Sequence, residues 1–237
     1  MLALRRQVYV VPFCVLALLT TAAQAEMYTG SLSTGDGGLD GTGAWGTGPS
    51  SLSWTIQTVE GPIWQYCYTL EVPERGISHT ILELSDDFSW ENIESPQLWV
   101  NGEEVPWMDV EAEIANYGPG DPGNPLIPDT VYGIKVDVPE PIDDNENGDV
   151  LLVTFCFLTL RDPVWGDFYS KDGTDPGTGE DVALWNAGFA DEDPFDFPAD
   201  GALDGHLLVP DDTEIPEPMT LMILAAGGMA AMLRRQR

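Results

Sequence analysis

The chain has 237 residues, of which 40 are Asp or Glu and only 9 are Lys or Arg, so its formal net charge at pH 7 is −31. This charge excludes nucleic acid as a natural partner, because binding to phosphates requires clustered basic residues. The length is sufficient for one domain with a substantial hydrophobic core.

The N-terminus has the pattern of a secretory signal peptide. Two Arg residues precede an apolar stretch over residues 8–19, and Ala23 and Ala25 form a small-x-small cleavage site. The sequence therefore predicts a signal helix within residues 1–25, its removal after export, and a mature chain that starts at Glu26.

Short segments that alternate apolar and polar residues dominate the body of the chain, which is typical of half-buried strands. The clearest runs from Trp64 to Val72. The segment from Val150 to Leu160 is almost entirely apolar, as expected of a central strand covered on both faces. The expected strands are 51–58, 64–72, 78–84, 97–100, 105–110, 131–138, 150–160, 168–170, 182–185 and 205–209.

This pattern predicts an all-β domain over residues 26–210, folded as an antiparallel β-sandwich of jelly-roll-like type. Gly and Pro recur every few residues, so long helices are not expected in it. Residues 30–49 are rich in Gly, Ser and Thr and predict a loop or flexible arm. Residues 117–128 predict a long surface loop, and the end of the acidic, Pro-rich stretch 190–216 predicts a tether.

Two cysteines remain after removal of the signal peptide. Cys67 and Cys156 each lie in a strong strand prediction, and an exported chain enters an oxidising compartment. We expect them to form a disulfide, which requires their strands to be neighbours or to face each other. The alternative is two unpaired thiols that are buried as small hydrophobic side chains.

Residues 143–149 read Asp-Asp-Asn-Glu-Asn-Gly-Asp and suggest calcium as a cofactor, because calcium prefers such oxygen ligands. The segment lacks the Glu that would complete an EF-hand loop, so any site would need ligands from elsewhere. The alternative is an Asn-Gly hairpin turn between the strands predicted on either side. The candidate ligands are Asp143, Asn145, Asn147 and Asp149.

Aromatic residues beside acidic ones suggest a sugar-binding surface. Trp165 and Tyr169 lie close to Asp167 in the sequence, and exposed rings flanked by carboxylates are a common way for a β-sandwich to bind carbohydrate. The alternative is that both rings belong to the hydrophobic core.

Evidence for catalysis is sparse. The chain has two histidines, His79 and His206, and it contains no motif of a nucleophilic hydrolase, zinc protease or nucleotide-binding enzyme. We therefore expect no enzyme. The enzymatic alternative is a carboxylate-based glycan hydrolase, because such a reaction needs only a pair of Asp or Glu residues.

The C-terminal 22 residues predict a membrane-held tail. An apolar stretch of 15 residues, 219–233, would form a helix of about 22 Å, short of the ~30 Å hydrocarbon core, so we expect a single marginal transmembrane helix. Basic residues stay on the cytoplasmic side, which places the body outside. The polar residues that flank the stretch are Pro216, Glu217, Pro218, Arg234, Arg235 and Arg237.

This combination resembles the PEP-CTERM sorting signal. The resemblance implies that an exosortase-type membrane protease recognises residues 211–237, after transient anchoring in the inner membrane, and that the protein is sorted to the cell surface or extracellular matrix. Segments 123–125, 131–135, 163–173 and 185–189 also resemble a group of secreted PEP-CTERM proteins to which we attach no activity.

The sequence therefore predicts an exported cell-surface or extracellular-matrix protein with a structural or adhesive role. The first alternative is a carbohydrate-binding module with extracellular polysaccharide as its partner. The second is the glycan hydrolase.

Overall fold

The computed structural model describes residues 25–73, 76–139, 150–175 and 177–210. This part consists mainly of antiparallel strands, so the expected all-β sandwich is confirmed. The predicted signal helix before residue 25 and the tail after residue 210 lie outside the described residues. Among the helices of the described part, none is long and apolar enough to cross a membrane.

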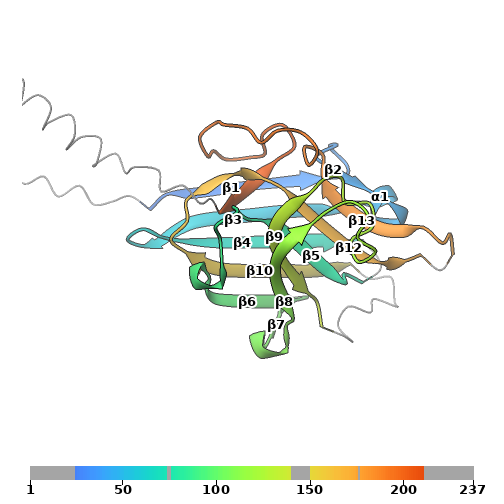
Figure 1. Ribbon diagram of the computed structural model, residues 1–237, viewed down its shortest axis with the longest axis horizontal. Coiled ribbons are helices and arrows are strands. Elements are labelled where there is room, and N and C mark those ends of the chain that lie inside the picture. The colour runs from blue at the N-terminus through green and yellow to red at the C-terminus, as the bar shows by residue number, and fades with distance from the viewer. Residues whose placement is uncertain (1–24, 74–75, 140–149, 176, 211–237) are drawn as a thin grey trace, which may run out of the picture.

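Two six-stranded sheets lie face to face (Figure 1), and a separate two-stranded pair contacts both of them. The first sheet has the order β1 (Met27–Ser33), β3 (Ser51–Glu60), β4 (Ile63–Val72), β10 (Leu151–Thr159), β6 (Glu94–Val100), β7 (Glu103–Val105). The second has the order β2 (Leu39–Gly41), β13 (Asp181–Asn186), β12 (Phe168–Thr174), β5 (His79–Glu83), β9 (Val131–Asp137), β8 (Ala112–Tyr117). The pair is β11 (Pro163–Gly166) with β14 (Leu207–Pro210).

The core lies between the two large sheets and follows from the two-residue period of the strands. Along β4, every second side chain is buried, and the residues between them are less so. The inward-facing residues of this strand are Trp64, Tyr66, Tyr68, Leu70 and Val72.

The predicted flexible arm is wrong. Residues 30–49 contribute most of β1, all of β2 and the short helix α1 (Gly43–Thr47). Trp45 in this helix is fully buried. A few buried apolar side chains, Leu32, Leu39 and Trp45, therefore fix a segment whose composition is otherwise typical of a loop.

The strand expected over 105–110 is also wrong. Strand β7 ends at Val105, and Pro106, which has no N–H to donate to a ladder, precedes the 3-10 helix η2 (Trp107–Asp109). A second 3-10 turn, η1 (Trp90–Asn92), precedes β6.

The hairpin expected between the strands on either side of residues 143–149 is excluded. Strand β9 pairs with β5 and β8 in the second sheet, whereas β10 pairs with β4 and β6 in the first. The connection therefore passes from one sheet to the other. The residues proposed as calcium ligands, Asp143, Asn145, Asn147 and Asp149, lie outside the described part of the chain.

The expected disulfide is confirmed. Cys67 on β4 and Cys156 on β10 stand directly opposite each other in the antiparallel register and are bonded, with their Cα atoms 4.2 Å apart. The bond joins two central strands of one sheet that are 89 residues apart in the sequence.

Candidate metal centre

Most residues predicted for sorting and for signal-peptide cleavage cannot be placed in the structure. The sorting residues Pro216, Glu217, Pro218, Arg234, Arg235 and Arg237 and the cleavage-site residue Ala23 lie outside the described chain. Ala25 is described, and Glu26, the expected first residue of the mature chain, donates its backbone N–H to the hydroxyl of Thr58 at 3.0 Å.

The expectation of a sugar-binding platform at Trp165 and Tyr169 requires correction. Their exposed fractions are 3% and 0%, so neither ring offers a face to a ligand. The hydroxyl of Tyr169 instead donates to the backbone carbonyl of Pro125 at 2.6 Å, which ties the loop before β9 to β12. Both rings are core residues.

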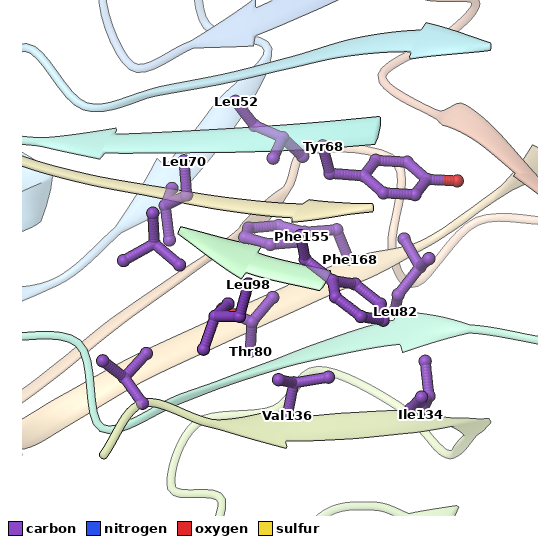
Figure 2. Close-up of a pocket in the computed structure, with 12 residues that line it drawn as sticks. Leu52, Tyr68, Leu70, Thr80, Leu82, Leu98, Ile134, Val136, Phe155 and Phe168 are labelled. Atoms are coloured by element: carbon purple, nitrogen blue, oxygen red, sulfur yellow. The ribbon is translucent and has the colours of Figure 1, made fainter. Parts of the chain in front are cut away.

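A small internal cavity lies between the two large sheets, and Figure 2 shows the side chains that point into it. Its volume is about 30 Å³, which matches the space of roughly one water molecule. The lining is almost wholly apolar, with Phe155 and Phe168 facing each other from the two sheets. We interpret it as a packing void, because a sugar or peptide could not enter it.

A cluster of polar side chains lies where β5 and β13 end and where β12 and β14 begin. Asp167 stands between β11 and β12, Asn186 ends β13 and Glu83 ends β5. His206 directly precedes β14, and Asp193 reaches the cluster from the loop that follows β13. We call Asp167, Asp193 and His206 the acidic–histidine cluster.

Hydrogen bonds fix Asp167 from three sides. Its backbone N–H donates to Glu83 Oε2 at 2.7 Å, and its backbone carbonyl accepts from the N–H of Glu83 at 3.0 Å. The side-chain amide of Asn186 donates to Asp167 Oδ1 at 2.7 Å and to the carbonyl of Gly205 at 2.9 Å. This network holds the carboxylate of Asp167 toward His206.

Glycines allow the chain to approach the cluster closely. A Cβ atom at Gly188 would lie 2.4 Å from Cε1 of the His206 ring, so only glycine fits there. A Cβ at Gly166 would lie 2.8 Å from Glu83 Oε2. Gly205 has a φ of +82°, a conformation that favours glycine and turns the chain into β14.

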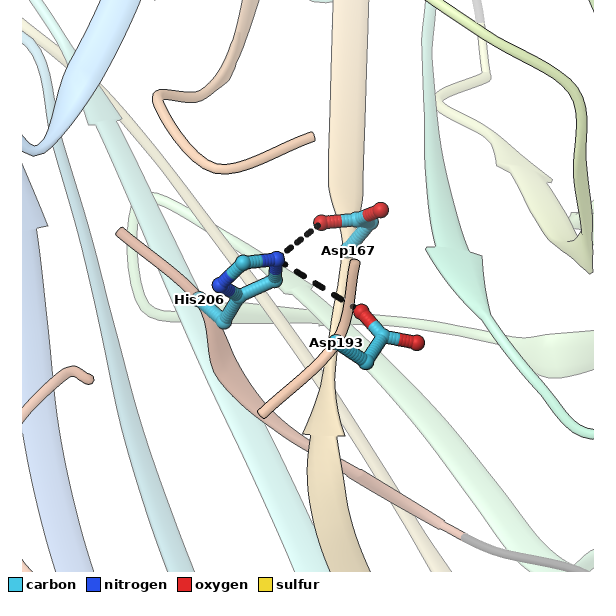
Figure 3. Close-up of side chains that lie close together, drawn as sticks. All are labelled: Asp167, Asp193 and His206. Carbon is cyan, nitrogen blue, oxygen red and sulfur yellow. Dashed lines mark ion pairs between the residues drawn. The ribbon is translucent and has the colours of Figure 1, made fainter. Parts of the chain in front are cut away.

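The imidazole of His206 is buried and has no hydrogen-bond partner. Its side chain is 1% exposed, and neither ring nitrogen makes a hydrogen bond. Nε2 points between two carboxylates, 3.7 Å from Asp167 Oδ1 and 3.5 Å from Asp193 Oδ1 (Figure 3). Both distances are too long for a hydrogen bond. The cluster meets solvent at Asp193, whose side chain is 44% exposed.

The acids of this region share a raised pKa. Burial raises the pKa of Glu83 to about 8, and the carboxylates of Asp193 and Asp167 act in the same direction. Burial raises the pKa of Asp167 to about 7 against the opposing hydrogen bond from Asn186. Burial also raises the pKa of Asp193, and His206 opposes that rise. Their negative charge is therefore poorly stabilised by the surrounding protein, and a bound cation would reverse these shifts.

One ligand atom from each member of the acidic–histidine cluster lies within 4.8 Å of the other two. Imidazole nitrogen together with carboxylate oxygens is a donor set that divalent transition-metal ions accept. Among the described residues, these three form the one group of at least three His, Cys, Asp or Glu side chains whose ligand atoms are close enough to hold such an ion.

Sequence reasoning missed the cluster because its members are separated by 26 and 13 positions and come from different loops. The sequence draws attention to His206 and Asp167 only singly, and Asp193 lies in the acidic, Pro-rich stretch 190–216, whose end predicts a tether. The sequence does offer one signal, since a glycine directly precedes two members of the cluster, Gly166 before Asp167 and Gly205 before His206.

No protein-family model matches the chain, and no curated protein matches it. Among solved structures, a GH31 alpha-xylosidase from Xanthomonas citri is similar over 56% of this chain and 11% of its own length. The identity is 13% and the TM-score is 0.19, so this likeness carries no argument about fold or function.

Proposed function

We propose that the protein is an exported cell-surface or extracellular-matrix protein with a structural or adhesive role. The disulfide between Cys67 and Cys156 is the observation that carries this proposal, because disulfides persist in oxidising compartments outside the cytosol. The signal-peptide pattern and the resemblance of residues 211–237 to a PEP-CTERM signal support it independently.

The sorting route is part of the proposal. An exosortase-type protease would process the tail near Pro216, Glu217 and Pro218 after a helix over 219–233 has held the chain in the inner membrane. We also propose that the β-sandwich has a jelly-roll-like topology, in the order in which its strands are connected. Calcium would bind residues 143–149.

An adhesive role is supported by the loop between β13 and β14. Phe195 and Phe197 in this loop have exposed fractions of 97% and 85%, the highest among the exposed aromatic side chains of the described residues. Exposed aromatic side chains close together in the sequence are typical of binding surfaces, because solvent exposure of such large apolar groups is unfavourable.

We keep the carbohydrate-binding module and the glycan hydrolase as alternatives of lower rank. The carbohydrate-binding module depended on Trp165 and Tyr169, which are buried. The glycan hydrolase needs a pair of carboxylates that a sugar can reach, and the sequence assigns no residues to that pair.

Fractionation of producing cells tests the proposal. We expect the wild-type chain on the outside of the cell, and we expect a variant with Arg234, Arg235 and Arg237 replaced by Glu to remain unprocessed in the inner membrane or to be mislocalised. A matched control replaces the basic residues Arg161 and Lys171 of the body instead. A cytosolic wild-type chain, or identical processing of the tail variant, would contradict the proposal.

A further inference from the structure

We propose that Asp167, Asp193 and His206 form a binding site for one divalent first-row transition-metal ion, for which zinc is the probe. This inference does not depend on the proposed function, because it rests on the geometry of the acidic–histidine cluster alone.

The first argument is convergence. The three side chains come from the start of β12, the loop after β13 and the residue before β14, yet one ligand atom of each lies within 4.8 Å of the others. The distances from His206 Nε2 to the two carboxylates, 3.7 and 3.5 Å, exceed a hydrogen bond but suit two ligands of a shared ion. Figure 3 shows Nε2 directed between the two oxygen atoms.

The second argument is the unpaired imidazole. A buried polar group without a hydrogen bond costs free energy, and such groups are rare in folded proteins. Coordination of a metal ion by Nε2 gives this nitrogen a partner. The same ion would balance the carboxylates of Asp167 and Asp193, which otherwise lie close together with like charge.

The third argument is orientation by neighbouring groups. Metal-bound carboxylates are usually held by further hydrogen bonds, and Asn186 donates one to Asp167 Oδ1 at 2.7 Å. Glu83 accepts from the backbone N–H of Asp167 and fixes the same residue from the other side. These contacts position Asp167 before any ion arrives.

The donor set selects the class of ion. Calcium and magnesium prefer oxygen ligands alone, whereas imidazole is a good ligand for zinc and its neighbours in the first transition row. The exposed side of Asp193 leaves room for water to complete the coordination.

The ion would also fix a loop. Asp193 precedes Phe195 and Phe197 by two and four positions, so its coordination would hold the loop with the two exposed rings against β14. Removal of the ion should therefore increase the mobility of this loop more than that of the sheets.

The test measures zinc binding to the full chain after treatment with a chelator. Wild type should bind one zinc ion per chain with a raised melting temperature, because a ligand of the native state stabilises it. Asp193→Asn should weaken zinc binding by at least about tenfold. Asp196→Asn, which removes the same charge from an exposed position of the same loop, should bind zinc as wild type does.

Two further measurements keep the test decisive. Cobalt in place of zinc should give visible absorption bands in wild type that are lost in Asp193→Asn, and a thermal melt shows that this variant is folded. Calcium should not displace the cobalt. Wild type that binds no zinc, or an Asp193→Asn variant that matches Asp196→Asn, would overturn the proposal.

Discussion

The two histidines of the chain are both buried but have different surroundings. His206 has no hydrogen-bond partner, whereas His79 Nε2 lies 2.7 Å from Asn124 Oδ1 and donates to it. Asn124 in turn donates to Asp121 Oδ2 at 2.7 Å, so His79 ties the loop over 117–128 to β5. A neutral imidazole satisfies this network, which gives His79 a structural role.

This role predicts acid sensitivity. Burial lowers the pKa of His79 to about 4, and Lys135 and Lys171 act in the same direction against Asn124 and Asp121. Asp137, whose Oδ1 lies 3.8 Å from Nδ1, also faces the ring. The folded state therefore binds the proton less readily than the unfolded state, in which the pKa is near 6.5.

The contribution of His79 to stability should be complete above about pH 6.5 and should decline as the pH falls toward 4. The shift corresponds to about 3 kcal/mol at most. Urea unfolding of wild type and His79→Gln across this pH range measures the contribution of His79. The buried acids with a raised pKa change the free energy of unfolding with pH in the opposite direction, but they are present in both proteins, so the difference between the two cancels their effect. A difference that does not change with pH would show that His79 is not held neutral.

The disulfide gives a second prediction at the residue scale. Replacing Cys67 and Cys156 together by Ser should lower the free energy of unfolding by up to about 4 kcal/mol. The disulfide links residues 89 positions apart, and without it the unfolded chain gains conformational entropy. Urea unfolding without reductant measures the loss. Wild type treated with reductant should lose a similar amount, and an unchanged midpoint in both would contradict the structural role of the bond.

At the scale of elements, helix α1 shows what composition can hide. Its five residues include two Gly and two Thr or Ala, and no periodic apolar pattern marks it. Trp45 is the fully buried residue of α1 and anchors it in the core, where α1 packs against β13.

Trp45→Ala should therefore cost about 3–5 kcal/mol of stability, as removal of a large buried ring does. Trp90→Ala is the matched control, since Trp90 is 43% exposed and its loss should cost less than about 1 kcal/mol. Equal effects of the two substitutions on the urea midpoint would show that α1 does not contribute to the core.

Strands with strong alternation could be predicted from the sequence, and β4 and β10 lie within one or two residues of their expected bounds. Among the missed strands, β2, β7 and β11 are three or four residues long, too short to show a period. The other two, β1 and β8, are edge strands whose side chains are mostly exposed or half-buried, so they lack a strong apolar alternation. Sheet membership could not be predicted either, because alternation gives the faces of a strand but not its partners.

The acidic–histidine cluster could not be predicted for the same reason. Its residues become neighbours only through the pairing of β11 with β14 and of β12 with β13. Asp193 is one of 40 acidic residues in the chain, and nothing in its spacing from Asp167 or His206 relates it to them. By contrast, Cys67 and Cys156 could be paired because they were the two cysteines left after signal-peptide removal.

At the scale of the whole molecule, the net charge of −31 is the dominant property. Repulsion among so many like charges destabilises a compact fold, and dissolved ions screen it. The melting temperature should rise when the salt concentration increases from about 10 mM to about 500 mM, and choline chloride should act like sodium chloride if screening is the cause. A melting temperature independent of salt would show that surface repulsion does not limit stability.

The intact mass of the protein recovered from outside its producing cell tests export and processing most directly. We expect a chain that begins at Glu26, has lost the end of its tail and is lighter by two hydrogens because Cys67 and Cys156 are bonded. The complete 25.8 kDa chain with free thiols, recovered from the cytosol, would contradict the account.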